Sequence, residues 1–210
     1  MRRYYVIAWG DFNNSGFLDF LVTGARDPLG SESLQLYRNI LNHQFLKSPT
    51  ERFDGGLFGG AFWGDYDNDN DLDVFVLGEE PFEGASIKTL RNGMPFNNLL
   101  PSAPDGLQAT PQGNAVTFTW NPGSDVQTPT PGLTYNLRVG TTPGGLNVVS
   151  PMALPATGHR LVPRRGNAEH NTSWTLKNLT PGTYYWSVQT LDNSFKGSPF
   201  AQEGSFTINE

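Results

Sequence analysis

The chain has 210 residues, a formal net charge of −6 at pH 7 and no cysteine. Without cysteine, disulfide bonds and zinc–thiolate sites are excluded, and no apolar run reaches the roughly 18 residues needed to cross a bilayer. The first 100 residues carry 14 acidic and 8 basic side chains, whereas residues 101–210 carry six of each. This acidic half argues against nucleic acid and anionic membranes as partners, and it favours cations.

Glycine (24) and proline (16) are abundant and follow no collagen-like period, which is typical of short strands joined by turns. The first residues, Met1 to Tyr5, lead into no apolar core of the kind found in signal peptides, so no signal peptide is predicted. A first strand starting near Tyr4 suits a piece of a longer chain.

One motif recurs at a spacing of 54 residues. Ala8–Asp19 (AWGDFNNSGFLD) lies over Phe62–Asp73 (FWGDYDNDNDLD), and LYRN at 36–39 lies over TLRN at 89–92. Such self-similarity indicates two copies of one structural unit. Each copy is predicted as strand, loop and strand, because aromatic and β-branched residues flank both loops. The predicted strands are Tyr4–Trp9, Phe20–Val22 and Val74–Leu77, with the two strands after the loops ending at Gly24 and Gly78.

Both loops place short oxygen-bearing side chains at alternate positions, and Ca²⁺ takes about six to eight oxygen ligands. The expected ligands are Asp11, Asn13, Ser15 and Asp19 in the first loop and Asp65, Asp67, Asp69 and Asp73 in the second, with backbone carbonyls from Phe17 and Asp71. Gly16 and Asn70 stand where such a loop needs a sharp turn, often with positive φ. An EF-hand is excluded, because its bidentate glutamate is replaced by a valine within an apolar strand. We predict one Ca²⁺ in each loop, bound more tightly in the second loop because it has more carboxylates.

These residues resemble FG-GAP/VCBS-type repeats, the blades of integrin-like β-propellers. The resemblance covers about residues 4–98 and rests on the two WGD loops, the LYRN string and FGGA at 58–61. It implies blades of about four strands that each hold one Ca²⁺, although Ser15 and Asn70 depart from the family pattern. Two copies cannot close a ring of about 4–8 blades, so we expect a partial propeller, with upstream blades of a longer parent chain as one partner. Trp9 and Trp63 are expected to pack between blades, and Arg38 and Arg91 to pair with a nearby carboxylate or carbonyl.

A second pattern follows a proline-punctuated linker at 99–106. Alternating strands are predicted at 116–120, 133–139, 173–176, 184–189 and 205–208, with a loop-rich insert between Gly140 and Thr172. Residues 107–210 resemble a fibronectin type III domain, an immunoglobulin-like β-sandwich. The resemblance implies a core role for Trp120 and a tyrosine corner at Tyr185, and Trp174 is expected in the core. The predicted fold class is therefore all-β, with two calcium-binding blades at 1–98 and a sandwich at 107–210.

No catalytic motif is present: there is no Gly-x-Ser-x-Gly elbow and no zinc-binding helix pattern. A calcium-bound carboxylate is also a poor general acid, because the ion lowers its pKa. We predict a calcium-binding interaction and scaffold module, not an enzyme, from a secreted or cell-surface protein of bacterial type. Its ligand would be a protein or a glycan, with no nucleic acid and no membrane insertion. The alternative is an accessory fragment of a secreted carbohydrate-active enzyme, such as a polysaccharide lyase built on a calcium propeller.

Overall fold

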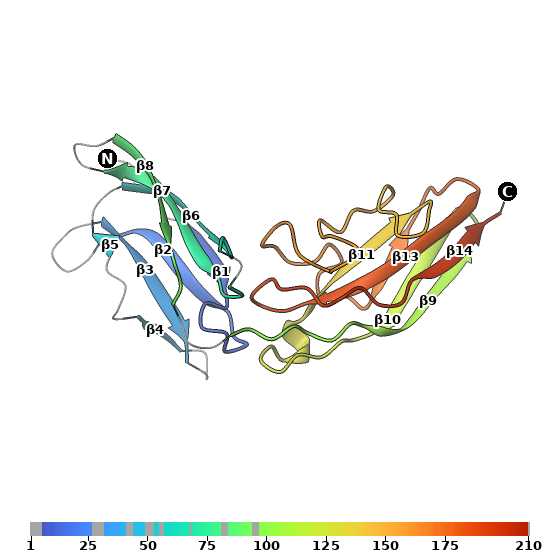
Figure 1. The fold of residues 1–210 in the computed structure, drawn as a ribbon, viewed down its shortest axis with the longest axis horizontal. Coiled ribbons are helices and arrows are strands. Elements are labelled where there is room, and N and C mark those ends of the chain that lie inside the picture. Colours follow the sequence, from blue (N-terminus) through green and yellow to red (C-terminus); the bar gives the residue numbers. More distant parts are fainter. Residues whose placement is uncertain are drawn as a thin grey trace. The chain divides into compact units, whose positions relative to one another are not determined.

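The computed structural model describes residues 6–26, 32–40, 44–48, 53–54, 57–67, 69–80, 84–93 and 97–209. Within these ranges the protein is all-β, and its one helical element is a short 3-10 turn at Thr130–Gly132. The chain divides into two compact units, Met1–Asn98 and Leu99–Glu210, each built from two antiparallel sheets (Figure 1). Among the described residues, no helix is long and apolar enough to cross a membrane.

The first unit contains one sheet for each copy of the repeat. The first sheet has the order β1-β2-β3-β4, with β5 also paired to β3, and the second has the order β6-β7-β8. The strands are β1 (Ile7–Gly10), β2 (Asp19–Arg26), β3 (Glu32–Asn39), β4 (Phe45–Lys47), β5 (Phe53–Asp54), β6 (Leu57–Gly64), β7 (Asp73–Glu80) and β8 (Gly84–Leu90). In each sheet the predicted loop joins the first two strands (Figure 1).

Strand ends differ from the sequence prediction at both glycines. Gly24 does not end β2, because the pairing with β3 shifts register between Val22 and Ala25 and the strand continues to Arg26. The φ of 75° at Gly24 allows this bulge, which absorbs one extra residue. Likewise, β7 continues through Gly78 to Glu80. Tyr4 and Tyr5, predicted as part of the first strand, lie outside the described residues.

The two sheets of the first unit stack face to face, and the described strands form no closed ring. Strands β1, β2 and β3 all contact β6. Between the sheets lie buried side chains from both copies of the repeat: Leu21, Leu34, Leu36, Ala61, Trp63, Val74 and Val76. Gly10 allows the close approach, because a Cβ there would lie 2.9 Å from the Leu72 Cδ1 atom and 3.0 Å from the indole of Trp63. Trp63 therefore packs between the two sheets of the first unit, whereas Trp9, expected to pack in the same way, stays 48% exposed.

The second unit is a sandwich of two three-stranded sheets, with orders β12-β10-β9 and β11-β13-β14. The strands are β9 (Asp105–Gln112), β10 (Ala115–Asn121), β11 (Thr134–Gly140), β12 (Ser173–Leu176), β13 (Gly182–Leu191) and β14 (Gly204–Ile208). This order corresponds to the E-B-A and C-F-G strands of immunoglobulin-like domains. The core between the sheets contains Trp120, as predicted, and Trp186. The ring of Phe118 lies 4.5 Å from that of Trp186.

Three expectations for the second unit need correction. The tyrosine corner is Tyr184 rather than Tyr185, because the buried Tyr184 hydroxyl donates to the carbonyl of Thr180 at 2.8 Å. Trp174 is 37% exposed rather than in the core, since it lies on β12, whose residues are mostly exposed. The predicted linker at 99–106 ends early, because β9 begins at Asp105. The pattern of β9 was obscured by Gly106 and Pro111, which are unusual within strands.

The insert between Gly140 and Thr172 covers the edge of β11. Its main chain pairs with that strand at Val149 and Glu169. Between these two points the side-chain amide of Asn167 accepts from the Leu137 N–H and donates to the Leu137 carbonyl, both at 2.8 Å. The insert thus satisfies backbone groups that an exposed sheet edge would leave open to another chain.

Candidate metal centre

Three carboxylates of the second loop converge. One oxygen each from Asp65, Asp67 and Asp73 lies within 4.8 Å of the others, so the group could hold a metal ion. Asp65 and Asp67 belong to the loop that follows β6, and Asp73 is the first residue of β7. The donors are all oxygens, which suits a hard cation such as Ca²⁺ better than a transition metal.

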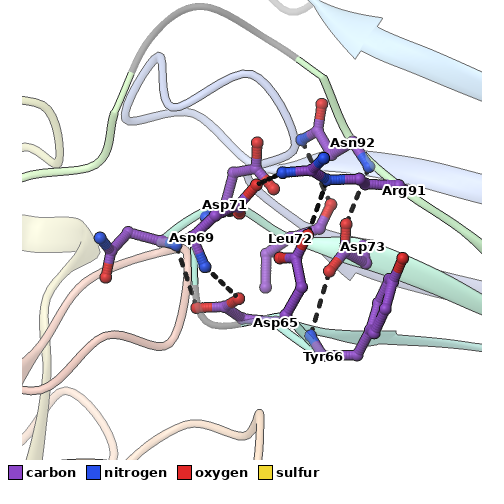
Figure 2. A network of polar contacts seen from close by, with 10 residues as sticks. Asp65, Tyr66, Asp69, Asp71, Leu72, Asp73, Arg91 and Asn92 are labelled. Atoms are coloured by element: carbon purple, nitrogen blue, oxygen red, sulfur yellow. Dashed lines mark hydrogen bonds and ion pairs between the residues drawn. The ribbon is translucent and has the colours of Figure 1, made fainter.

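Backbone hydrogen bonds hold two of these carboxylates in place (Figure 2). Asp65 accepts from the N–H groups of Asp69 and Asn70, at 3.1 and 3.2 Å. Asp73 accepts from Tyr66 at 3.0 Å and from Asn92 at 2.8 Å. The turn this requires has a φ of 77° at Asn70, as predicted for that position. The carboxylates are therefore positioned by the folded loop itself.

Arg91 lies beside the same loop, on the exposed side. Its terminal nitrogen is 2.9 Å from Asp69 (Figure 2). Its Nε is 2.6 Å from Asp67. The expected pairing of Arg91 with a nearby carboxylate is confirmed. Because both partners are predicted metal ligands, the guanidinium supplies positive charge where we expect an ion. Arg38, the corresponding residue of the first copy, lowers the pKa of Asp19 through its charge, although burial leaves that pKa raised overall.

The first loop repeats the arrangement with fewer acids. Asp11 accepts from the N–H groups of Ser15 at 2.9 Å and Gly16 at 2.6 Å, and Asn13 accepts from Ser15 at 3.2 Å. Asp19 accepts from Phe12 at 3.1 Å, as Asp73 does from Tyr66. Gly16 has the predicted positive φ, 84°. The loop therefore brings Asp11, Asn13 and Ser15 together, but it offers two carboxylates where the second loop has five.

Burial sets the titration of the acids. It raises the pKa of Asp11 and of Asp19 to about 6, because water is excluded from both carboxyl groups. In the second loop, burial and the hydrogen bond to Asp69 raise the pKa of Asp71 to about 7. Burial opposes ionisation of Asp69 as well, but its hydrogen bond with Arg91 lowers the pKa overall. A bound cation would favour the charged form of every one of these groups.

Two asparagines of the site were not predicted. Asn39 and Asn92 end the two LYRN-type strings, and each donates its backbone N–H to the aspartate that begins the second strand of its sheet, at 2.8 Å. The Asn92 side chain also donates to the carbonyls of Leu72 at 3.2 Å and Phe12 at 2.8 Å, so it ties the second loop to the first. The signal was in the sequence, since the asparagine recurs in both copies, but the repeat alone did not assign it a role.

The predicted side-chain ligands of the second loop thus fall into two groups. Asp65, Asp67 and Asp73 converge. Asp69 instead accepts from Arg91 and from the N–H of Asp71, at 2.9 and 3.3 Å. The expected carbonyl ligands, Phe17 and Asp71, remain predictions, although the Asp71 side chain is buried with one oxygen that has no hydrogen-bond partner.

Comparisons with known proteins bear mainly on this part of the chain. Residues 11–76 match the model of the FG-GAP-like repeat family. The match includes both acidic loops and the strands between them. No curated protein matches the chain.

Among solved structures, the chicken CNTN1 FN1-FN3 domains are similar to this chain at 9% sequence identity and a TM-score of 0.41. The similarity covers 92% of this chain and 75% of that one. The description of the second unit as a β-sandwich depends on its own strand order and core.

Proposed function

We propose that the chain is a calcium-stabilised interaction module of a secreted or cell-surface protein. The observation that carries this proposal is the convergence of Asp65, Asp67 and Asp73 on one point, within a loop whose hydrogen bonds recur in the first copy. Carboxylates brought this close repel one another, and a divalent cation removes that cost. The FG-GAP-like match over residues 11–76 supports the same reading.

Calcium would act as a structural element. Asp73 begins β7 and accepts from Tyr66 in the loop and Asn92 after β8, so an ion at its carboxylate would stabilise three segments together. Binding and folding are then coupled, and at about 100 times the dissociation constant an ion adds roughly 2.7 kcal/mol per site. The second unit, with its covered sheet edge, would serve as spacer or as a second binding surface. We assign the chain a binding role rather than a catalytic one, because its acid cluster suits a cation better than a general acid.

Calorimetry of the full chain in CaCl₂, MgCl₂ and EDTA tests the proposal. We expect the first unit to melt at a higher temperature in calcium than in either other condition. The best variant is Asp67→Ala, since Asp67 supplies an oxygen to the cluster and forms an ion pair with Arg91. Its melting temperature in EDTA should stay close to that of the unchanged chain, while the gain from calcium is reduced.

Two comparisons sharpen the test. Asp65→Ala and Asp73→Ala should reduce the gain from calcium more than Asp11→Ala, because the second loop has more carboxylates. Asp105→Ala, an exposed acid of β9, is the matched control and should leave the gain intact. An identical melt in calcium and EDTA would refute the calcium role.

A further inference from the structure

The two sheets of the first unit bury opposite faces. One side of each sheet bears the repeated tryptophan, and we call it the tryptophan face. In the first sheet it carries Trp9, which lies directly across from Phe20 on the neighbouring strand. In the second sheet it carries Trp63, which lies directly across from Val74. The tryptophan face is buried in the second sheet, whereas in the first sheet Trp9 is 48% and Ile7 56% exposed on it. The stack is therefore head-to-tail, with the tryptophan face of one copy against the other side of its neighbour.

The reverse holds for the side that we call the opposite face, which bears Leu21 in the first sheet and Phe62 and Phe75 in the second. Leu21 is buried against the second sheet, whereas Phe62 is 56% exposed. Leu77 and Ile87, paired across β7 and β8, extend this exposed surface, and Ile87 is 71% exposed. Each molecule therefore leaves one face of each kind without a described sheet against it.

The contacts inside the stack indicate what each exposed face would receive. Trp63 packs against Gly10 and against the ring of Phe12, 6.0 Å away. The residues of the second copy that correspond to Gly10 and Phe12 are Gly64 and Tyr66, and Tyr66 is exposed. Trp9 corresponds to Trp63. The surface that corresponds to the partner of Trp63 is therefore the one around Gly64 and Tyr66, where the ring of Phe75 lies against Gly64.

A hydrogen bond between the two copies also has equivalent groups on the exposed faces. Across the stack, the Asn92 side chain donates to the carbonyl of Phe12. The corresponding donor and acceptor are Asn39, which is half-buried, and the carbonyl of Tyr66. The two exposed faces therefore carry, at equivalent positions of the repeat, the tryptophan, glycine, asparagine and carbonyl groups that meet inside the stack.

We propose that a second copy of this chain is the partner: the tryptophan face of one molecule stacks on the opposite face of another, repeating the internal interface. The exposed surfaces favour this occupant because each is the repeat equivalent of one of the two surfaces that already pack together within the molecule. Exposed apolar surface of this kind on a folded protein marks an interaction site. A contact between two different faces can be extended, so it produces rings or open chains of molecules rather than a simple two-fold dimer. The inference depends on the repeat geometry and not on calcium.

Light scattering coupled to size exclusion, on the full chain in calcium at increasing concentration, tests the proposal. The tryptophan-face variant carries Trp9→Ser and Phe45→Ser; the ring of Phe45 lies 6.0 Å from that of Trp9. The opposite-face variant carries Phe62→Ser and Ile87→Ser. Val126→Ser, at an 82% exposed apolar side chain of the second unit, is the control. Melting curves check that each variant folds. If a double variant is unfolded, Ile7→Lys replaces it on the tryptophan face and Ile87→Lys on the opposite face, since both positions are exposed.

We expect the unchanged chain and the control to gain mass with concentration. Each double variant alone should be monomeric, because every contact needs one face of each kind. An equimolar mixture of the two variants should form a heterodimer and nothing larger, since only one intact pair of faces remains. A chain that stays monomeric at every concentration overturns the proposal. So does self-association of the opposite-face variant alone, which would indicate a symmetric contact between tryptophan faces.

Discussion

Replacing Asn92 by alanine tests whether the two copies of the repeat are held together by hydrogen bonds as well as by apolar packing. Asn92 is 3% exposed, and its side-chain amide donates to the carbonyls of Phe12 and Leu72. Alanine removes both donors and leaves two buried acceptors. A buried polar group without its partner costs about 1–3 kcal/mol, so the loss of both partners should cost about 2–6 kcal/mol. In a unit of about 100 residues, 1 kcal/mol corresponds to roughly 4–8 °C of melting temperature.

The internal repeat supplies the control for this experiment. Asn39 is the corresponding residue, but its side chain makes one long hydrogen bond, 3.4 Å to the carbonyl of Leu18, and it is only half-buried. Asn39→Ala should therefore cost less than about 1 kcal/mol. Both variants are measured by urea unfolding and by calorimetry in EDTA, so that calcium does not enter the comparison. If Asn39→Ala destabilises the protein as much as Asn92→Ala, the cross-repeat hydrogen bond to Phe12 is not what stabilises the stack.

Three further substitutions or conditions have defined outcomes. Gly10→Ala should destabilise the first unit by about 1–3 kcal/mol in thermal unfolding, because the new Cβ would lie 2.9 Å from the Leu72 side chain and 3.0 Å from the indole of Trp63; an unchanged melt would contradict the close packing. Tyr184→Phe should cost about 1 kcal/mol, through loss of the hydrogen bond to Thr180, whereas Tyr185→Phe should cost nothing measurable. Burial raises the pKa of Asp11 and of Asp19 from 3.8 to about 6, so the stability they contribute is complete below pH 3.8 and is lost as the pH rises through 6, by about 3 kcal/mol for each group. In EDTA the first unit should therefore melt at a lower temperature at pH 7 than at pH 4.5, and an opposite trend would contradict the raised values.

The sequence located the strands of the second unit except β9, and in the first unit those that flank the two loops, but not β3, β4, β5 and β8. Alternation placed β10, β11 and β12 within one residue of their bounds, because one face of a sandwich strand is apolar and the other is polar. It failed for β9, where Gly106 and Pro111 interrupt the pattern. It also failed for Trp174, which lies on the same face as the buried Phe118 but on an edge strand of its sheet, so that its side chain stays 37% exposed. The sequence also misplaced the tyrosine corner by one residue, since the prediction was Tyr185 and the structure has Tyr184.

The loops were more predictable than their surroundings, for a physical reason. Ligand spacing and positive φ at Gly16 and Asn70 are local properties that a short segment determines by itself. The roles of Arg91 and Asn92 are not local: these residues reach Asp69 and Phe12, which lie 22 and 80 positions earlier in the chain. A repeat reveals such long-range contacts only when both copies are compared in space. That comparison also separates Trp9 from Trp63, which are equivalent in sequence but exposed and buried in the fold, because a stack of two unlike faces must leave one tryptophan without a neighbouring sheet.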